Sequence, residues 1–184
     1  WQEIITIVEP RAADKGILLK YEEQTEGAAA GCVLGSPLHV RQIFINILGN
    51  AIKYTDAGGH VLCQVTIKAI GESRISCRTV ISDNGIGMSQ EYLTKIFEAF
   101  TREQNTTKSK ITGTGLGMSI VKKYVALLGG TINVESELGK GSVFIVTLKH
   151  KIADKSYYAK KYVENQETGS GILKGRNVLL AEDN

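Results

Sequence analysis

The clearest periodic pattern in the chain lies between residues 35 and 55, with the sequence GSPLHVRQIFINILGNAIKYT. Apolar residues recur there at helical spacing, as on one side of a helix that packs on a sheet. This apolar stripe comprises Val40, Ile43, Phe44, Ile47, Leu48 and Ala51. Ser36 is a good N-cap and Pro37 suits the first helical position, so the pattern predicts a helix with a defined start.

A polar row runs along the same helix and comprises Gln42, Asn46, Asn50 and Lys53. Asparagine is a mediocre helix former because its amide competes for backbone groups. Two asparagines in so apolar a helix therefore suggest a ligand with oxygen atoms, or a metal ion, beside the row. The alternative is that both amides face water or cap a neighbouring loop, and the helix alone leaves both interpretations open.

Shorter patterns predict further helices and strands around this helix. Helices are expected over residues 1–13, with a break or bend at Pro10, over 90–97, and over 118–128 before Gly129. Alternating apolar residues predict strands over 17–22, 32–34, 60–70, 74–82, 131–136 and 142–149, with a loop over 24–31. This order predicts an α+β fold, a two-layer α/β sandwich in which helices cover one face of a mixed, mostly antiparallel sheet.

Three polar or atypical stretches set the predicted domain organisation. Residues 101–112 contain almost no apolar side chain and are expected to form a mobile polar loop within a domain of residues 1–150. Residues 151–175 have the composition of a linker. Residues 176–184, RNVLLAEDN, then begin with an apolar strand and are expected to be the truncated start of a further domain.

Composition narrows the class of protein. The 184 residues are 42% apolar and 22% charged, as in ordinary soluble globular proteins, and the net charge of +3 is scattered, so no nucleic-acid partner is expected. Cys32, Cys63 and Cys77 are expected to be reduced, buried thiols, and the histidines are too isolated for a zinc site. No apolar run is long enough for a membrane helix, so we expect a cytoplasmic domain. Because the sequence begins with Trp, we also expect it to be a piece of a longer chain, which could carry a membrane anchor elsewhere.

Two glycine-rich motifs, DNGIG at residues 83–87 and GTGLG at 113–117, point to a nucleotide. Neither fits the Rossmann or P-loop pattern. The second motif ends where a helix begins, a favourable place for phosphate, and Asp83 can accept a hydrogen bond from the amine of a base while Gly85 and Gly87 let its ring approach the backbone. Because Mg²⁺ takes oxygen ligands and keeps several waters, the amide oxygen of Asn50 is a suitable single protein ligand.

Four motifs follow one another along the chain: NILGNAIKYT at 46–55, DNGIGM at 83–88, IFEAFTR at 96–102 and GTGLGMSI at 113–120. In this order they resemble the catalytic and ATP-binding domain of bacterial sensor histidine kinases, within the larger family of DNA gyrase B, MutL and the large heat-shock chaperone ATPases. The closing ESELGKGSVFIVTL also resembles the last hairpin of that family. The resemblance covers residues 1–150 and implies the Bergerat-type ATP-binding fold.

The resemblance implies roles at the phosphate end of a Mg²⁺·ATP site. Asn50 would bind Mg²⁺, with Asn46 beside the phosphates. Lys53 and Arg102 would stabilise phosphate charge during catalysis, and residues 101–112 would form a lid. Thr101 stands where the family often has an aromatic residue, which loosens that edge of the expected pocket.

The resemblance also implies roles at the adenine end. Asp83 would accept a hydrogen bond from the adenine amine, and Ser142 would support that carboxylate. Ser36 stands where the family often has Asp, and it caps the helix equally well. The remaining nucleotide-binding positions implied by the motifs are Tyr54, Gly85, Ile86, Gly87, Met88, Gly113, Thr114, Gly115, Leu116, Gly117 and Met118.

The resemblance implies partners that this chain does not carry. In such kinases the γ-phosphate goes to a histidine on a separate dimerisation domain, and none of the three histidines here lies in a segment of that kind. The final strand with Glu182 and Asp183 resembles the start of a receiver domain. We therefore expect a hybrid kinase that acts with a response regulator. The full-length protein is expected to be a homodimer, with or without an anchor in the inner membrane, and the 184-residue chain by itself is expected to be a monomer.

Two other functions are known for domains of this kind or compatible with its motifs. An ATPase of the gyrase or MutL kind is disfavoured because its helix carries a glutamate that activates water, and no glutamate occurs between residues 38 and 55. A non-catalytic, nucleotide-sensing regulatory module of the same fold remains the alternative to a kinase.

Overall fold

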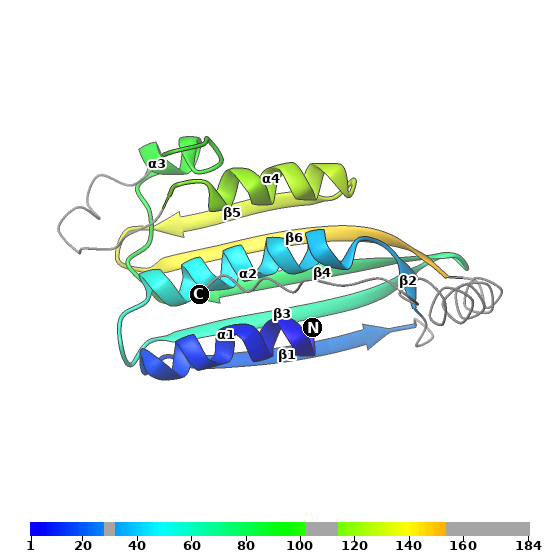
Figure 1. Ribbon diagram of the computed structural model, residues 1–184, viewed down its shortest axis with the longest axis horizontal. Helices are drawn as coiled ribbons and strands as arrows, with labels where there is room; N and C mark the ends of the chain where they lie inside the picture. Colours follow the sequence, from blue (N-terminus) through cyan, green and yellow to red (C-terminus); the bar gives the residue numbers. More distant parts are fainter. Residues whose placement is uncertain (28–31, 102–113, 154–184) are drawn as a thin grey trace, which may run out of the picture.

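The computed structural model describes residues 1–27, 32–101 and 114–153 (Figure 1). In chain order the elements are α1 (Gln2–Asp14), β1 (Leu18–Glu26), β2 (Val33–Leu34), α2 (Pro37–Tyr54), β3 (His60–Ile70), β4 (Arg74–Asp83), α3 (Gln90–Lys95), α4 (Gly117–Leu127), β5 (Thr131–Glu137) and β6 (Gly141–Ile152). No helix within the described ranges is long and apolar enough to cross a membrane.

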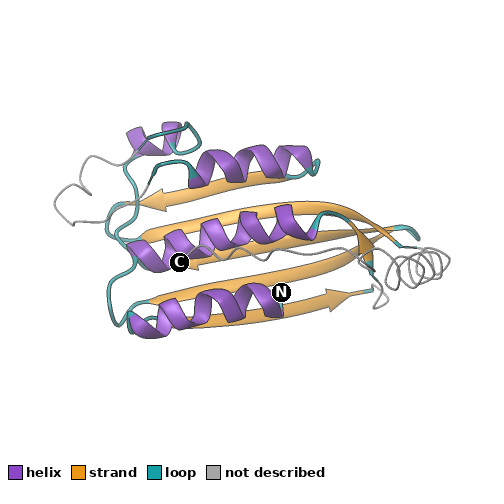
Figure 2. Cartoon of the chain, viewed as in Figure 1, coloured by secondary structure: helices purple, strands orange, loops and turns teal. Residues whose placement is uncertain are grey.

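The six strands form one mixed sheet in which only the pair β1–β3 is parallel. The order is β1-β3-β4-β6-β2, and β5 pairs with β6 on the same side as β2. Parallel strands need a long crossover connection, and the chain from β1 to β3 passes through β2 and α2. The predicted fold class, a two-layer α+β sandwich with a mostly antiparallel sheet, is confirmed (Figure 2).

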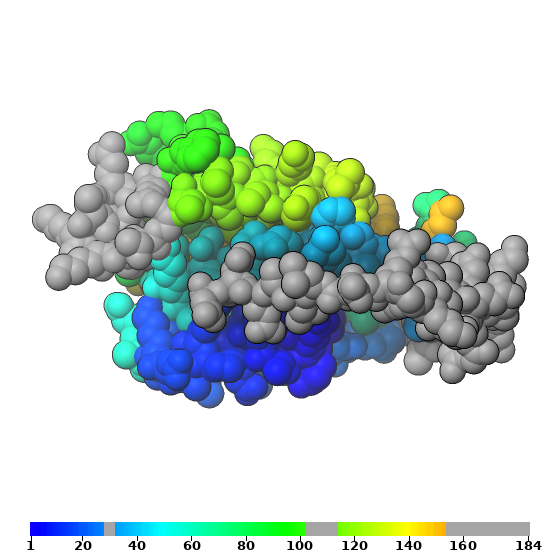
Figure 3. Space-filling model, in the orientation of Figure 1, coloured from blue at the N-terminus to red at the C-terminus, as the bar shows by residue number. Residues whose placement is uncertain are grey.

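Helices α1, α2 and α4 lie side by side over one face of this sheet, and Figure 3 shows them as successive bands across the molecule. The central helix, α2, carries the predicted apolar stripe into the core: Ile43, Ile47 and Leu48 are 0% exposed and Phe44 is 1% exposed. The sheet meets them with Val61, Cys63, Val65, Ile81, Phe144, Val146 and Leu148. Val40, at the start of the stripe, is only partly buried.

The structure differs from the predicted elements mainly at three places, and α3 also ends at Lys95, two residues before its predicted end. The break expected at Pro10 is wrong, since α1 continues to Asp14. Proline has no N–H group, so the carbonyl of Thr6 receives no hydrogen bond from Pro10. Both residues are exposed, which lets water take the place of that bond. The loop expected from residue 24 begins later, because β1 pairs with β3 as far as Glu26, where an ion pair of 2.9 Å joins Glu26 to Lys68. The last strand also runs further than predicted, to Ile152.

The expectation of three buried thiols is correct for Cys63 and wrong for Cys32, which is exposed. Cys77 is half-buried, and all three are free. Burial raises the pKa of the Cys63 thiol to about 12, which keeps it protonated and unreactive at neutral pH.

The central position of α2 yields a stability prediction. Leu48→Ala should lower the free energy of unfolding by about 2–5 kcal/mol, because a fully buried leucine is replaced by a cavity. Leu38→Ala on the same helix is the matched control: Leu38 is 65% exposed, and its loss should change stability by less than about 0.5 kcal/mol. Urea denaturation measures both, and equal losses would contradict the assignment of the buried face.

Candidate functional site

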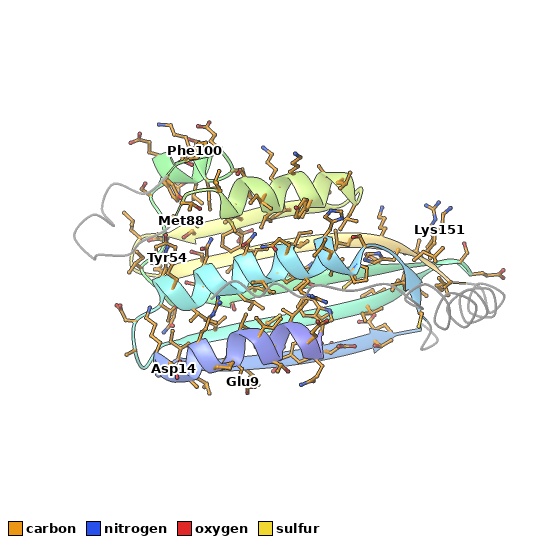
Figure 4. The ribbon with its side chains drawn as sticks, in the orientation of Figure 1. Glu9, Asp14, Tyr54, Met88, Phe100 and Lys151 are labelled. Carbon is orange, nitrogen blue, oxygen red and sulfur yellow. The ribbon has the colours of Figure 1, made fainter. Side chains whose placement is uncertain are left out.

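A pocket of about 260 Å³ opens at one end of the molecule, where the carboxyl ends of α2 and β4 meet the amino end of α4. Tyr54 and Met88, two of its lining residues, lie at the end opposite Lys151 (Figure 4). The predicted site residues that line it are Asn46, Asn50, Lys53, Tyr54, Asp83, Ile86, Gly87, Met88, Thr114, Gly115, Gly117 and Met118. Residues separated by more than sixty positions in the chain are thus brought to one cavity.

The other predicted site residues fall into two groups. Gly85, Leu116 and Ser142 do not line the pocket but lie directly beside residues that do. Arg102 and Gly113 lie outside the described residues, as does the predicted lid apart from Thr101, which contributes to the wall.

One side of the pocket is formed by the polar row of α2 and the start of α4. Asn46 connects the two helices: its side-chain oxygen accepts a bond of 3.3 Å from Gln42, and its nitrogen donates one of 3.5 Å to the Gly117 carbonyl. The Asn50 amide has no hydrogen-bond partner within the described parts of the chain, so its oxygen is available to a ligand. The Lys53 ammonium lies 4.9 Å from the centre of the Tyr54 ring, on the same side.

The amino end of α4 is suited to an anion. Its N-cap, Leu116, provides no side-chain hydrogen bond, so the first backbone N–H groups of the helix keep their donor capacity. Gly115 and Gly117 bring this end close to the cavity without a side chain in the way. Free N–H groups and the helix dipole together favour a negatively charged group, and Lys53 adds a positive charge nearby.

Asp83 provides the only carboxylate among the described lining residues. Burial raises the pKa of its carboxyl group, and hydrogen bonds from the backbone N–H groups of Gly85, at 2.9 Å, and Ser142 act against that rise. Asp83 and Ser142 are register partners on β4 and β6. The carboxylate is therefore held in place from behind, with its remaining acceptor capacity toward the pocket.

The glycines of the first motif pack against backbone as well as facing the pocket. A Cβ atom on Gly85 would overlap the Tyr54 carbonyl oxygen. One on Gly87, where φ is +66°, would overlap the carbonyl of Glu137. These glycines thus permit the loop to lie between α2 and the β5–β6 hairpin, a role that the sequence analysis did not assign to them.

Some lining residues were missed by the sequence analysis. Tyr92 and Ile96 come from α3 and the turn after it, Phe144 comes from β6, and Ala51 from α2. Phe144 has a visible signal, since it occupies an inward position of an alternating strand two residues after Ser142. For Tyr92 no local signal exists, because its position depends on how the short helix α3 packs.

Metal ligands of the usual clustered kind do not occur here: the described ranges contain no group of three or more His, Cys, Asp or Glu side chains. Asn50 is a single neutral oxygen donor beside a positively charged lysine. Such a donor suits a hard cation that keeps its water shell and is held mainly by the phosphates of a ligand.

Comparisons with known proteins give consistent results. The sequence model of a family described as "Histidine kinase-, DNA gyrase B-, and HSP90-like ATPase" matches residues 35–152. Sensor histidine kinase AruS of Pseudomonas aeruginosa is 32% identical over 99% of this chain, and autoinducer 2 sensor kinase/phosphatase LuxQ of Vibrio parahaemolyticus is 32% identical over 97%. The chain spans only 20% of the length of each.

A solved structure is similar as well. The crystal structure of full-length ShkA in complex with AMPPNP matches with a TM-score of 0.63 at 33% identity, covering 83% of this chain and 29% of that one.

The packing of Gly87 leads to a prediction about the loop. Gly139→Ala should cost about 1–2 kcal/mol, because φ there is +77° but a Cβ atom would meet no neighbour. Gly87→Ala adds an overlap with the Glu137 carbonyl to a similar backbone strain, so its loss should exceed about 3 kcal/mol. Urea denaturation of the two variants distinguishes them, and equal losses would mean that the hairpin moves aside without cost.

The raised pKa of Asp83 leads to a pH prediction. The folded state holds the proton of this carboxyl more tightly than the unfolded state, so stability falls as pH rises from the ordinary pKa of an aspartate through the raised one. Asp83→Asn removes this cost and should make the free chain more stable than wild type at neutral pH, with the difference vanishing in acid. Denaturation at both pH values tests this; a variant less stable at neutral pH would contradict it.

Proposed function

The chain belongs to the family of histidine kinase-, DNA gyrase B- and HSP90-like ATPases, and from this premise we propose that it binds Mg²⁺·ATP and presents the γ-phosphate to a histidine on a separate phosphoacceptor domain. One observation carries the proposal. The pocket has a half-buried carboxylate, Asp83, on one wall and a cationic, N–H-rich region on another, which suits a molecule with a base at one end and phosphates at the other.

The proposed binding mode assigns the base to the Asp83 wall. Asp83 accepts a hydrogen bond from the adenine amine, with the Ser142 N–H holding the carboxylate in place. Apolar contact comes from Ile86, Met88 and the Tyr54 ring. A base with a carbonyl in place of this amine would put two acceptors together, so the site should favour adenine.

The phosphates are assigned to the α2–α4 wall. Asn50 binds Mg²⁺, which neutralises phosphate charge when it is bound, and Asn46 lies beside the phosphates. Gly115 and Gly117, with Thr114, Leu116 and Met118, surround the phosphate chain at the start of α4, and the same role is proposed for Gly113, which lies outside the described residues. Lys53 and Arg102 stabilise the charge of the group that is transferred, since phosphoryl transfer depends mainly on placement and electrostatics.

The acceptor histidine is proposed to lie outside residues 1–184. None of the three histidines of the chain lines the pocket. His39 is half-buried with its ring 4.5 Å from that of Tyr124, His60 is exposed at the start of β3, and burial lowers the pKa of His150 near the end of β6. Phosphorylation of this chain by itself is therefore not expected.

The same pocket argues against ATP hydrolysis as the main activity. An ATPase of the gyrase kind uses a glutamate to activate water, and among the described residues no glutamate lines the cavity. The nucleotide-sensing regulatory module remains the second candidate. Joining this chain to a phosphoacceptor domain and assaying for phosphohistidine separates the two: a kinase labels the histidine, and a regulatory module binds ATP without labelling it.

The rest of the protein is proposed from the relatives, of which this chain spans one fifth. A linker over 151–175 and the start of a receiver domain over 176–184, with Glu182 and Asp183, fall outside the described residues beyond Ala153. A dimeric parent that signals to a response regulator, in the cytoplasm or anchored at the inner membrane, fits this organisation. The fragment itself is proposed to be a monomer.

Calorimetric titration of ATP tests the proposed site. Wild-type protein should bind ATP more tightly with Mg²⁺ than without it. Asp83→Asn should weaken binding about tenfold to a hundredfold, because a charged hydrogen bond to the amine is lost. Asn50→Ala should bind with little dependence on Mg²⁺.

Asn133→Ala is the control for the asparagine substitution, since Asn133 is exposed on β5 away from the cavity. It should bind ATP as wild type does. Wild-type protein that binds no adenine nucleotide would contradict the proposal.

A further inference from the structure

A single hydroxyl group near the end of β5 joins a residue that lines the pocket to the strand that lies behind Asp83. The Ser136 Oγ accepts a hydrogen bond of 2.9 Å from the Met88 N–H, and it donates one of 2.7 Å to the Gly141 carbonyl. It also lies 3.0 Å from the Ser142 Oγ. A serine hydroxyl has one proton and two lone pairs, and since the proton goes to Gly141, the Ser142 hydroxyl must be the donor in the third contact. The hydroxyl group thus uses its one donor and both of its acceptor positions.

These three contacts reach both sides of the proposed base-binding region. Met88 lines the pocket at the end of the first glycine motif. Gly141 and Ser142 begin β6 directly behind Asp83, where a Cβ atom on Gly141 would overlap the Asp83 carbonyl and the Ser142 N–H supports the Asp83 carboxylate. Ser136 is therefore bonded both to the loop that carries Met88 and to the strand that positions the Asp83 carboxylate.

The other hydrogen bonds of this loop act before Met88. The Gly85 N–H donates to the Asp83 carboxylate at 2.9 Å, and two further bonds act at Ile86. The Ile86 N–H donates to the Tyr54 carbonyl at 3.1 Å, and the Gly139 N–H donates to the Ile86 carbonyl at 2.8 Å. Both hold Ile86, which precedes Met88 by two residues. Ser136 is the group that binds the Met88 N–H itself.

We propose that Ser136 is a positioning residue for base recognition: it sets the separation between Met88 and the Asp83 carboxylate and thereby the preference for adenine over other purines. The inference rests on the proposed function, since it assumes that a nucleotide base lies at this wall. Ser136 does not line the pocket, so it acts through Met88 and Ser142.

The phosphate side should be independent of Ser136. Asn46, Asn50 and Lys53 are carried by α2, and Gly117 belongs to α4. Within the described residues, the Ser136 hydroxyl bonds to Met88, Gly141 and Ser142 and to none of these four residues. A loss of the hydroxyl should therefore change which base is preferred and leave the effect of Mg²⁺ unchanged.

The experiment compares ATP with GTP, which carries a carbonyl where adenine has its amine. In Ser136→Ala, the ratio of ATP affinity to GTP affinity should fall about tenfold, because an unpaired Met88 N–H lets the wall shift away from the carboxylate. The ratio of ATP affinities with and without Mg²⁺ should stay at the wild-type value. Ser136→Thr keeps the hydroxyl and should restore the preference for ATP.

Controls separate positioning from a general loss of structure. Ser76→Ala removes a half-buried serine on β4 that has no contact with the pocket, and it should leave both ratios unchanged. Melting temperatures are measured for every variant. If Ser136→Ala fails to fold, Ser136→Cys replaces it, and its weaker hydrogen bonds should give an intermediate preference.

The results that would overturn the inference are distinct from those against the proposed function. A wild-type preference for ATP in Ser136→Ala or Ser136→Cys would overturn it while leaving ATP binding intact. So would an equal loss of ATP and GTP affinity in step with the melting temperature, or a failure of Ser136→Thr to restore the preference. A wild-type protein that binds no ATP would overturn the proposed function together with this inference.

Discussion

The burial of one face of α2 against the sheet is the interaction on which the rest of the structure depends. Ile43, Ile47 and Leu48 are completely buried at the centre of the core, and this fixes the rotation of the helix about its axis. Because Asn46, Asn50 and Lys53 lie on another side of the same helix, fixing the rotation also directs them along the cavity. The hydrophobic effect thus determines where the proposed metal ligand lies.

The carboxyl end of α2 needs its own stabilisation, because its last carbonyl groups have no helical partner. The Lys15 ammonium donates to the carbonyls of Ile52, at 3.0 Å, and Lys53, at 2.7 Å. A positive charge at a helix carboxyl end also interacts favourably with the dipole. The cation comes from the segment after α1, so the first helix helps to hold the end of α2 that carries the pocket.

The opposite wall shows a conflict between stability and the proposed function. Burial of Asp83 disfavours its charged form, and backbone N–H groups from Gly85 and Ser142 offset part of that cost. The fold thus keeps a carboxylate at a place where burial disfavours its charged form. Partly buried charges of this kind are expected at functional sites, where a bound ligand can supply the contact that offsets the cost of burying them.

Much of this could be predicted from the sequence, for reasons that particular residues make clear. The helix from Pro37 to Tyr54 has a local cap and a strong period, so its start and its buried face were both predictable. The fold class followed from the order of elements. The residues proposed for the adenine and the phosphates come from motifs that the fold brings to one pocket.

What could not be predicted depends on contacts between distant segments. Pro10 is tolerated because the packing of Val8 and Ala12 outweighs one lost hydrogen bond, and the end of β1 is set by its partner β3 rather than by its own polar sequence. The roles of Gly87 and Ser136 arise from the approach of the β5–β6 hairpin. Nothing in the local sequence around either residue contains that information.

The most direct test of the account is a crystal structure of this chain with a non-hydrolysable ATP analogue and Mg²⁺. We expect the adenine amine within hydrogen-bond distance of the Asp83 carboxylate and the metal ion bound to the Asn50 amide oxygen. A nucleotide bound elsewhere, or one bound in this pocket with its phosphates at Asp83 and its base at the start of α4, would contradict the account.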